Sequence, residues 1–288
     1  MRTRIGIATL ATAPFLWSFA LTMPAGVVTR PAANMHSAPS VDADVVSQAI
    51  YGTNIEILEQ RNNWARVRTP DEYTGWMYKA SLWVTDKPYA AAGNVGQVTS
   101  LFASIYREAD VRKHQPIVTV PFETRLEVVH ETNSGDTPWL EVRLPDGHFA
   151  WIQHGDVTMK PGKLNIPETI TLAKEFLGFP YLWGGTSSFG YDCSGFTQML
   201  YRELGVNLPR DADQQAAANV LAAVEKNRLR PGDLVYFGDS AQKITHTGLY
   251  IGNGEFISAS THERPVIQIT KLSDPHWAKA FVAARRPK

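Results

Sequence analysis

One cysteine stands where a helix is predicted to begin. Cys193 is the single cysteine of the 288 residues, which excludes an intramolecular disulfide and a cysteine-based metal site. Its neighbours Asp192, Ser194 and Gly195 are polar or small, which does not suit an inert packed thiol. Free backbone N–H groups at a helix start stabilise negative charge, so we expect a lowered pKa and a nucleophilic thiolate. The same N–H groups, with a hydroxyl such as that of Tyr181, could hold the oxyanion of acyl transfer.

A thiol nucleophile needs a base, and histidine is the usual base near neutral pH. The chain has eight histidines. His246 is the best placed of them, because it begins a predicted strand and a strand end can hold an imidazole rigidly against a helix start. The other histidines are expected to be solvated or packed. The sequence therefore predicts acyl-transfer chemistry by Cys193 and His246.

The elements around this pair predict an α+β domain over residues 165–288. A helix is expected from Pro167, with Ile170, Ala173, Phe176 and Leu177 on one buried face before Gly178 and Pro180 end it. Antiparallel strands are expected after the helices, which is typical of the α+β class. The remaining predicted elements are a helix from Cys193 to Gly205, a helix at about 212–224, and strands at 233–237, 246–251 and 255–259, the last two joined by a Gly252-Asn253-Gly254 turn.

An internal repeat precedes this domain. Trp64, Pro70-Asp71 and Trp76 recur 75 residues later as Trp139, Pro145-Asp146 and Trp151. Period-two alternation with Pro-Asp turns predicts short antiparallel strands. We expect two small all-β barrels, at residues 27–90 and 95–160, in which the tryptophans belong to the barrel cores rather than to a ligand site.

The sequence of the amino-terminal segment predicts that the protein is exported. Arg2 and Arg4 precede an apolar stretch over residues 5–23 and the small residues Pro24-Ala25-Gly26, a pattern typical of a signal peptide. Residues 1–26 are thus a predicted leader to the periplasm or cell envelope, and a retained membrane anchor is the alternative. Membrane contact is expected only through this leader.

The charge balance and the spacing of the histidines indicate which ligands and partners are not expected. Lys+Arg and Asp+Glu both number 28, so the net charge is zero and a basic stripe for nucleic acid is not expected. The histidines lack the paired spacing of a zinc site, and the proposed chemistry needs no cofactor. We therefore predict no metal, no cofactor and no nucleic-acid partner.

Several ordered motifs resemble the NlpC/p60 family of papain-like cysteine peptidases. They are Tyr-Leu-Trp-Gly-Gly at 181–185, Asp-Cys-Ser-Gly-Phe at 192–196, Pro-Arg-Asp-Ala-Asp-Gln-Gln at 209–215, Leu-Arg-Pro-Gly-Asp-Leu-Val-Tyr-Phe at 229–237 and His-Thr-Gly-Leu-Tyr-Ile-Gly-Asn-Gly at 246–254. The upstream repeat is similar to bacterial SH3-like domains. Together they resemble the YkfC-type subgroup, which implies hydrolysis of the γ-D-glutamyl to L-diamino-acid bond in peptidoglycan stem peptides or muropeptide fragments.

The resemblance implies a role for each matching residue. Cys193 attacks the amide carbonyl, and His246 activates the thiol and later protonates the leaving amine. Tyr181 lies near the oxyanion. Asp192 and Ser194 help to hold the free amino terminus of the substrate, because a carboxylate suits an ammonium group.

Helix capping is an alternative reading of two acidic residues. Asp192 could be the N-cap of the helix that Cys193 begins, and both of its roles are compatible. Asp211 could line the cleft, or it could cap the following helix. The subgroup also recruits an acid from its first SH3-like domain to bind the substrate amine, for which Glu72 is a candidate.

One position departs from the family pattern. Residues 256–259 read Phe-Ile-Ser-Ala, where the family usually has a histidine in place of Ser258. That third group normally orients the catalytic histidine and fixes its tautomer. Ser258 could do so here, or His262 could reach the site from a loop, or activity could be reduced. A cell-wall binding protein without turnover, and an amidase or acyltransferase on the same fold, are the competing functions.

Overall fold

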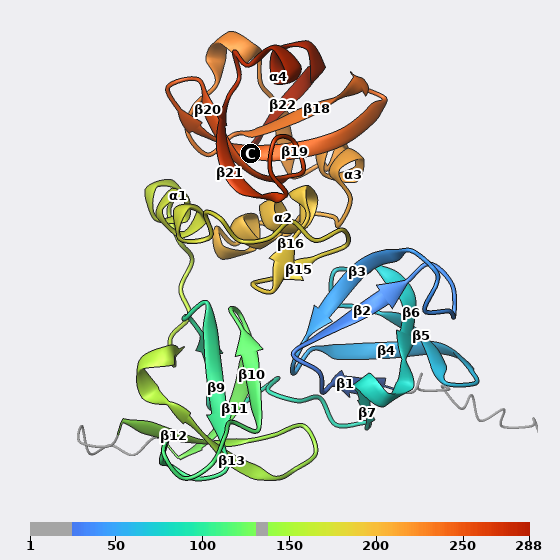
Figure 1. Cartoon of the computed structure of the whole chain (residues 1–288), viewed down its shortest axis with the longest axis vertical. Helices are drawn as coiled ribbons and strands as arrows, with labels where there is room; N and C mark the ends of the chain where they lie inside the picture. Colours follow the sequence, from blue (N-terminus) through green and yellow to red (C-terminus); the bar gives the residue numbers. More distant parts are fainter. Residues whose placement is uncertain (1–24, 131–137) are drawn as a thin grey trace, which may run out of the picture.

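The computed structural model describes residues 25–130 and 138–288. Three units are visible in Figure 1: two β units and one mixed unit, which carries the chain end marked C. Nearly all of the predicted leader lies outside the described residues. Residues 25 and 26, predicted to belong to it, begin the first strand instead. Among the described residues, the structure contains no helix of the length and apolarity needed to cross a bilayer.

The first β unit is a seven-stranded antiparallel sheet in the order β3-β2-β6-β5-β4-β1-β7. Its strands alternate buried and exposed residues, as the period-two pattern predicts. Its elements are β1 (Ala25–Val28), β2 (Ala32–His36), β3 (Val45–Ile50), β4 (Asn54–Arg61), β5 (Trp64–Arg68), β6 (Thr74–Tyr78), the 3-10 turn η1 (Lys79–Ser81) and β7 (Leu82–Val84).

The second β unit repeats this topology, with the order β10-β9-β13-β12-β11-β8-β14. Each strand of the first unit has its counterpart at the same place in the second sheet, which accounts for the 75-residue repeat. Its elements are β8 (Val95–Val98), β9 (Phe102–Tyr106), β10 (Val118–Pro121), β11 (Arg125–His130), β12 (Trp139–Arg143), β13 (Phe149–Gln153), η2 (His154–Asp156) and β14 (Val157–Thr158).

The mixed unit is the predicted α+β domain. Its six-stranded sheet has the order β17-β22-β18-β19-β20-β21, and each neighbouring pair is antiparallel. Its elements are α1 (Ile166–Glu175), β15 (Thr186–Ser187), β16 (Gly190–Tyr191), α2 (Cys193–Glu203), α3 (Ala212–Ala217), β17 (Leu221–Ala223), η3 (Lys226–Arg228), β18 (Leu234–Ser240), β19 (Lys243–Gly252), β20 (Glu255–Ser260), β21 (Val266–Lys271), α4 (Pro275–Ala280) and β22 (Phe281–Pro287).

Two apolar clusters cover the two faces of this sheet. Phe196, Met199 and Leu200 of α2 pack in one cluster with Leu249 and Ile257 of the sheet. The opposite face has a smaller cluster whose buried members are Val235, Phe237, Phe256, Leu272, Trp277 and Ala284. Alternation along β19 and β20 thus directs odd-numbered Leu249 and Ile257 toward α2 and even-numbered residues toward Trp277.

Some predicted helix details are wrong. The helix expected at about 212–224 ends at Ala217, and residues 221–223 form strand β17, which pairs with β22 at the edge of the sheet. In α1, Leu177 lies past the helix end and is 42% exposed, whereas Leu172, which was not expected in the core, is buried. The hairpin turn at 252–254 between β19 and β20 is confirmed.

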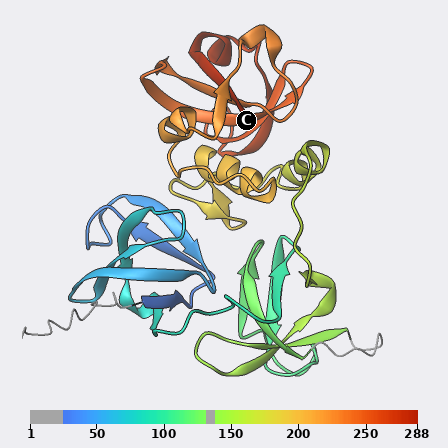
Figure 2. The same cartoon turned by 180° about the vertical axis from the view of Figure 1, so that it is seen from behind.

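Polar contacts attach both β units to the mixed unit. Thr186 donates its backbone N–H to the Gln48 side chain of the first unit at 3.1 Å. Ser188 donates its hydroxyl to the Leu101 carbonyl of the second unit at 2.6 Å. Figures 1 and 2 both show α2 and the β15–β16 ribbon on the side of the mixed unit that faces the two β units. The start of α2 therefore lies close to the first β unit.

Candidate active site

The Cys193 side chain lies at the first residue of α2, as predicted. Asp192 is the N-cap, and its Oδ1 accepts a hydrogen bond from the Gly195 backbone N–H at 2.7 Å. Two glycines allow the chain to pass this close: a Cβ on Gly195 would lie 2.2 Å from the Gly185 carbonyl oxygen, and one on Gly185 would lie 2.3 Å from that of Gly190. The loop before α2 can therefore press against the helix start only without side chains at these positions.

A buried arginine organises the residues next to the thiol. The Arg210 side chain is 2% exposed and binds both carboxylate oxygens of Asp192, at 3.0 Å through Nη1 and 2.5 Å through Nη2. Its Nη1 also donates to the Ser194 hydroxyl at 2.9 Å. Its Nε donates to the Ser47 hydroxyl of the first β unit at 3.2 Å. Arg210 thus joins the helix start to the first β unit. Sequence reasoning missed it, although it lies in the 209–215 motif.

These contacts give Asp192 and Ser194 structural roles, and their role in substrate binding stays a prediction. The carboxylate of Asp192 also accepts the Gly184 backbone N–H at 3.0 Å, so both oxygens are engaged and its charge is neutralised by Arg210. A substrate ammonium would have to displace the guanidinium to form a strong ion pair there. The predicted role of Asp192 as the N-cap of α2 is confirmed. Ser194 belongs to the same buried network and supports the guanidinium.

His246 lies on β19, opposite Phe237 of β18. Its Nε2 is 3.1 Å from the Ser258 hydroxyl of β20. Gly248, two residues after His246, makes room for this contact, because a Cβ there would lie 3.0 Å from the Ser258 Cβ and 2.6 Å from the Phe256 ring. If Nε2 carries the proton and donates it to Ser258, the lone pair of Nδ1 is free to accept one. The structure thus gives His246 a serine partner at the position where the family usually has a histidine.

The thiol approaches the strand that carries His246. The backbone N–H groups of Thr247 and Ser194 favour the thiolate of Cys193 electrostatically. Thr247 directly follows His246, so the sulfur lies beside the backbone of the candidate base. Among the hydrogen bonds of the described residues, none joins the Cys193 sulfur to the His246 ring. Catalytic hydrogen bonds are often long or misaligned before substrate binds, and they tighten in the complex.

The electrostatics differ from the expected resting thiolate. Burial raises the pKa of the Cys193 thiol to about 12, and the Asp192 charge adds to this shift. Burial also lowers the pKa of His246 to about 3, with His276 and His262 contributing. The helix start does stabilise the thiolate, but desolvation is the larger effect. The pair therefore rests as a neutral thiol and a neutral imidazole near pH 7, the state in which the imidazole can accept the thiol proton.

Tyr181 lies near the thiol. Tyr181 is half-buried, and burial followed by the nearby Cys193 charge raises the pKa of its phenol. Its hydroxyl therefore stays protonated and can donate to an oxyanion, as expected for this residue. Trp183, two residues on, is 68% exposed.

A tyrosine of the first β unit faces Asp211. Burial, then the Asp211 charge, raises the pKa of Tyr73. Burial also raises the pKa of Asp211, whose side chain makes no capping hydrogen bond to α3. Asp211 therefore lines the junction of the two units; it occupies the predicted N-cap position of α3, but its side chain makes no capping bond there. The Glu72 side chain is 80% exposed and lies 3.8 Å from Arg68, and its role as the amine-binding acid stays a prediction.

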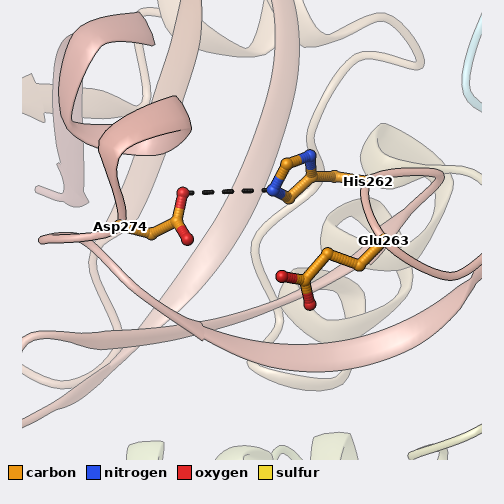
Figure 3. A group of neighbouring side chains, drawn as sticks. All are labelled: His262, Glu263 and Asp274. Atoms are coloured by element: carbon orange, nitrogen blue, oxygen red, sulfur yellow. Dashed lines mark ion pairs between the residues drawn. The ribbon is translucent and has the colours of Figure 1, made fainter.

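In the part of the chain that the structure describes, no hydrogen bond joins His262 to His246. Its Nε2 instead faces Asp274 at 3.9 Å, with Glu263 beside it, as Figure 3 shows. Its ring stacks on His276 at 4.2 Å between centroids. Of the two orienting groups that the sequence left open, Ser258 is the one in contact with His246.

A cavity of about 690 Å³ lies where the three units meet. Residues from all three line it, among them Asn54, Arg125 and Arg202. Neither Cys193 nor His246 contributes to its wall. We assign the chemistry to the start of α2 from the geometry of its reactive groups, because the thiol and the imidazole are not among the residues that line the cavity.

Comparisons with known proteins agree with this geometry. Residues 178–286 match the NlpC/P60 family, and residues 31–82 match the bacterial SH3 domain. A γ-D-glutamyl-L-lysine dipeptidyl-peptidase of Bacillus cereus is 33% identical over 262 residues, covering 83% of this chain and 74% of the relative. The Bacillus subtilis protein of the same name is 29% identical, covering 85% and 82%.

The fold comparison covers almost the whole chain. A crystal structure of an NlpC/P60 family protein from Bacillus cereus superposes with a TM-score of 0.80 at 28% identity, covering 91% of this chain and 99% of that one. The expected fold class, a papain-like mixed domain preceded by β-rich SH3-like units, is thereby confirmed.

Proposed function

The chain belongs to the NlpC/P60 family of cysteine peptidases, and on that premise we propose that it hydrolyses the γ-D-glutamyl to L-diamino-acid bond of peptidoglycan stem peptides. One observation carries the chemistry: the Cys193 thiol at the start of α2 lies beside the backbone of β19, where Ser258 holds the imidazole of His246. The relatives named for γ-D-glutamyl-L-lysine cleavage support the choice of bond.

The proposed acylation begins with a proton transfer. Nδ1 of His246 takes the Cys193 proton as the sulfur attacks the γ-carbonyl carbon of D-glutamate. The oxyanion accepts hydrogen bonds from the helix-start N–H groups and the Tyr181 hydroxyl. The imidazolium then gives its proton to the diamino-acid nitrogen as the carbon–nitrogen bond breaks, leaving a thioester on Cys193.

Deacylation runs through the same groups. His246 removes a proton from water, the water oxygen attacks the thioester carbonyl, and the sulfur leaves and regains its proton from the imidazolium. Ser258 would hold the ring in one orientation through both steps. The products are a free γ-carboxylate on D-glutamate and a free amine on the diamino acid.

The first β unit supports release of a short amino-terminal fragment. Tyr73 of this unit lies against Asp211 of the mixed unit, 18 residues after the nucleophile, so the first β unit can close the amino-terminal side of the substrate site. A free ammonium group, such as that of an amino-terminal L-Ala, would pair with the half-buried carboxylate of Asp211. We therefore infer a dipeptidyl activity that requires an unblocked amino terminus, with Asp211, which the sequence predicted to line the cleft, as the carboxylate that pairs with it.

Product mass tests this proposal. Purified L-Ala-γ-D-Glu-L-Lys and its diaminopimelate counterpart should yield L-Ala-γ-D-Glu, whereas the N-acetylated peptides should not be cleaved. Asp211→Asn should raise KM for the free peptide more than kcat, while Asp213→Asn, an exposed neighbour, should change neither. Cleavage at another amide would identify an amidase or acyltransferase instead. Wall binding without any turnover by the wild type would identify a binding protein.

We also propose that the chain acts outside the cytoplasm. This rests on the basic and apolar leader of residues 1–26. Amino-terminal sequencing of the protein from envelope and cytoplasmic fractions would test it, and an intact Met1 confined to the cytoplasm would contradict it.

A further inference from the structure

Three potential metal ligands converge on a loop at one side of the candidate active site. His262 and Glu263 lie between β20 and β21, and Asp274 immediately precedes α4. One ligand atom from each residue lies within 4.8 Å of the other two. Figure 3 shows the His262 ring and both carboxylates directed toward a common centre. We propose that these three residues bind a divalent transition cation of the zinc class.

The distances between the three ligand atoms suit such an ion after small movements of the side chains. Zinc bonds to nitrogen and oxygen of about 2.0–2.1 Å place tetrahedral ligands roughly 3.4 Å apart. The Nε2 of His262 and Oδ1 of Asp274 are already 3.9 Å apart, so small side-chain rotations bring them to that distance. An imidazole nitrogen favours Zn²⁺ over Mg²⁺ or Ca²⁺, which prefer all-oxygen sites. Three protein ligands would leave a fourth position for water.

Side chains of β20 and β21 hold the backbone of the loop in place. The His262 N–H donates to the Ser260 hydroxyl at 3.0 Å, and its carbonyl accepts the Gln268 side chain at 2.6 Å. Glu263 adopts a φ of 62°, a left-handed conformation that reverses the usual alternation and lets two consecutive side chains face the same centre. The ligand set is thus largely preorganised.

Helix capping and ion pairing account for only some of the positions of His262, Glu263 and Asp274. Asp274 Oδ1 caps α4 by accepting the His276 N–H at 2.9 Å, and the pair with His262 is a weak one at 3.9 Å. Neither role uses Glu263 or the second oxygen of Asp274. The sequence predicted no metal because these histidines lack paired spacing. The ligands instead come together through the packing of α4 against the 261–265 loop.

A cation bound at this site would affect the proposed catalytic base, because the two lie close together. Trp277 packs against His262, with centroids 5.4 Å apart, and against His246, with centroids 4.7 Å apart. A bound cation would lie one indole ring from the proposed base. Its positive charge would disfavour the imidazolium that forms during turnover, so occupancy should slow catalysis. This consequence rests on the proposed function, whereas cation binding itself does not.

Calorimetric titration with zinc chloride tests the site. The measurement uses full-length Cys193→Ala protein, because the thiol would otherwise compete for zinc. We expect saturable binding of one ion per chain, weakened at least ten-fold by adding His262→Ala or Asp274→Asn. The asparagine keeps an oxygen that can cap α4, so this variant should fold. His148→Ala, which removes an exposed histidine beside Asp146, is the matched control and should bind as Cys193→Ala does.

Two results would overturn the site: no saturable binding by Cys193→Ala, or equal affinity in the ligand and control variants. Zinc inhibition of otherwise wild-type peptidase should be weaker in His262→Ala than in His148→Ala. Equal inhibition would place the inhibitory zinc elsewhere, for example on Cys193, and would refute the catalytic consequence alone. Absence of peptidase activity would contradict the proposed function and leave the calorimetric result standing.

Discussion

Ser258→Ala removes the hydrogen bond that the described structure gives the His246 ring, at 3.1 Å between Nε2 and Oγ. The serine is buried, and its neighbours Phe256 and Gly248 leave little freedom for another group to enter. A neutral hydrogen bond contributes about 0.5–1.5 kcal/mol. If this bond orients the imidazole in the transition state, its loss lowers kcat by about 2- to 13-fold.

The assay is steady-state hydrolysis of L-Ala-γ-D-Glu-L-Lys, followed by mass spectrometry of the released dipeptide. KM should change little, because Ser258 contacts the base and not the substrate. Ser260→Ala is the matched control: it removes a hydroxyl from the same strand, one that accepts the His262 backbone N–H instead. Its kcat should stay within two-fold of the wild-type value. An unchanged kcat in Ser258→Ala, or an equal loss in both variants, would refute the orienting role.

Three further predictions concern the surroundings of the site. Arg210→Met should lower the free energy of unfolding by about 3–5 kcal/mol, because it leaves the buried Asp192 carboxylate without its partner; urea denaturation measures this, and a loss below about 1 kcal/mol would contradict it. Because the pKa of His246 is lowered to about 3, kcat/KM should keep its neutral-pH value as the pH falls below 6.5 and should decrease only as the pH approaches 3. A decrease in kcat/KM centred near pH 6.5 would contradict this, because it would show an imidazole with an ordinary pKa. Gly184→Ala should loosen the first β unit, since its Cβ would lie 2.8 Å from the Val45 carbonyl at a φ of 74°; faster proteolysis between the units would confirm this, and an unchanged cleavage pattern would refute it.

The lowered pKa of His246 also determines whether folding stability rises or falls with pH. Between about pH 3 and 6.5 the unfolded chain binds a proton at this histidine that the folded chain does not, so folding stability rises with pH across that window. His246→Gln should reduce this slope, as thermal unfolding at several pH values would show. An identical slope in both proteins would mean that His246 titrates alike when folded and unfolded.

Local features of the candidate site were predictable from sequence. Asp192 before Cys193 and Gly205 after the apolar positions set the ends of α2, and both signals act within a few residues. The hairpin at 252–254 fixes the pairing of β19 with β20, which brings Ser258 toward His246. Short-range capping and turn signals therefore located the helix start and the hairpin, whereas Ser258 was singled out by the resemblance to the NlpC/p60 pattern.

Features that depend on tertiary packing were not predictable. The burial of Arg210 depends on Asp192, 18 residues away, and on Ser47 in another unit. Tyr73 reaches Asp211 only because the first β unit docks on the mixed unit. The pKa of Cys193 was predicted in the wrong direction, because a sequence shows the helix start but not the desolvation that outweighs it.

The central claim is that the Cys193 sulfur performs the attack with His246 as its base. It is tested most directly by kcat for Cys193→Ala, His246→Ala and the double variant on L-Ala-γ-D-Glu-L-Lys. Groups that act as a unit are non-additive, so each single variant should lose at least about 1,000-fold and the double variant little more. Turnover by Cys193→Ala within ten-fold of the wild-type rate, or losses that multiply in the double variant, would contradict the account.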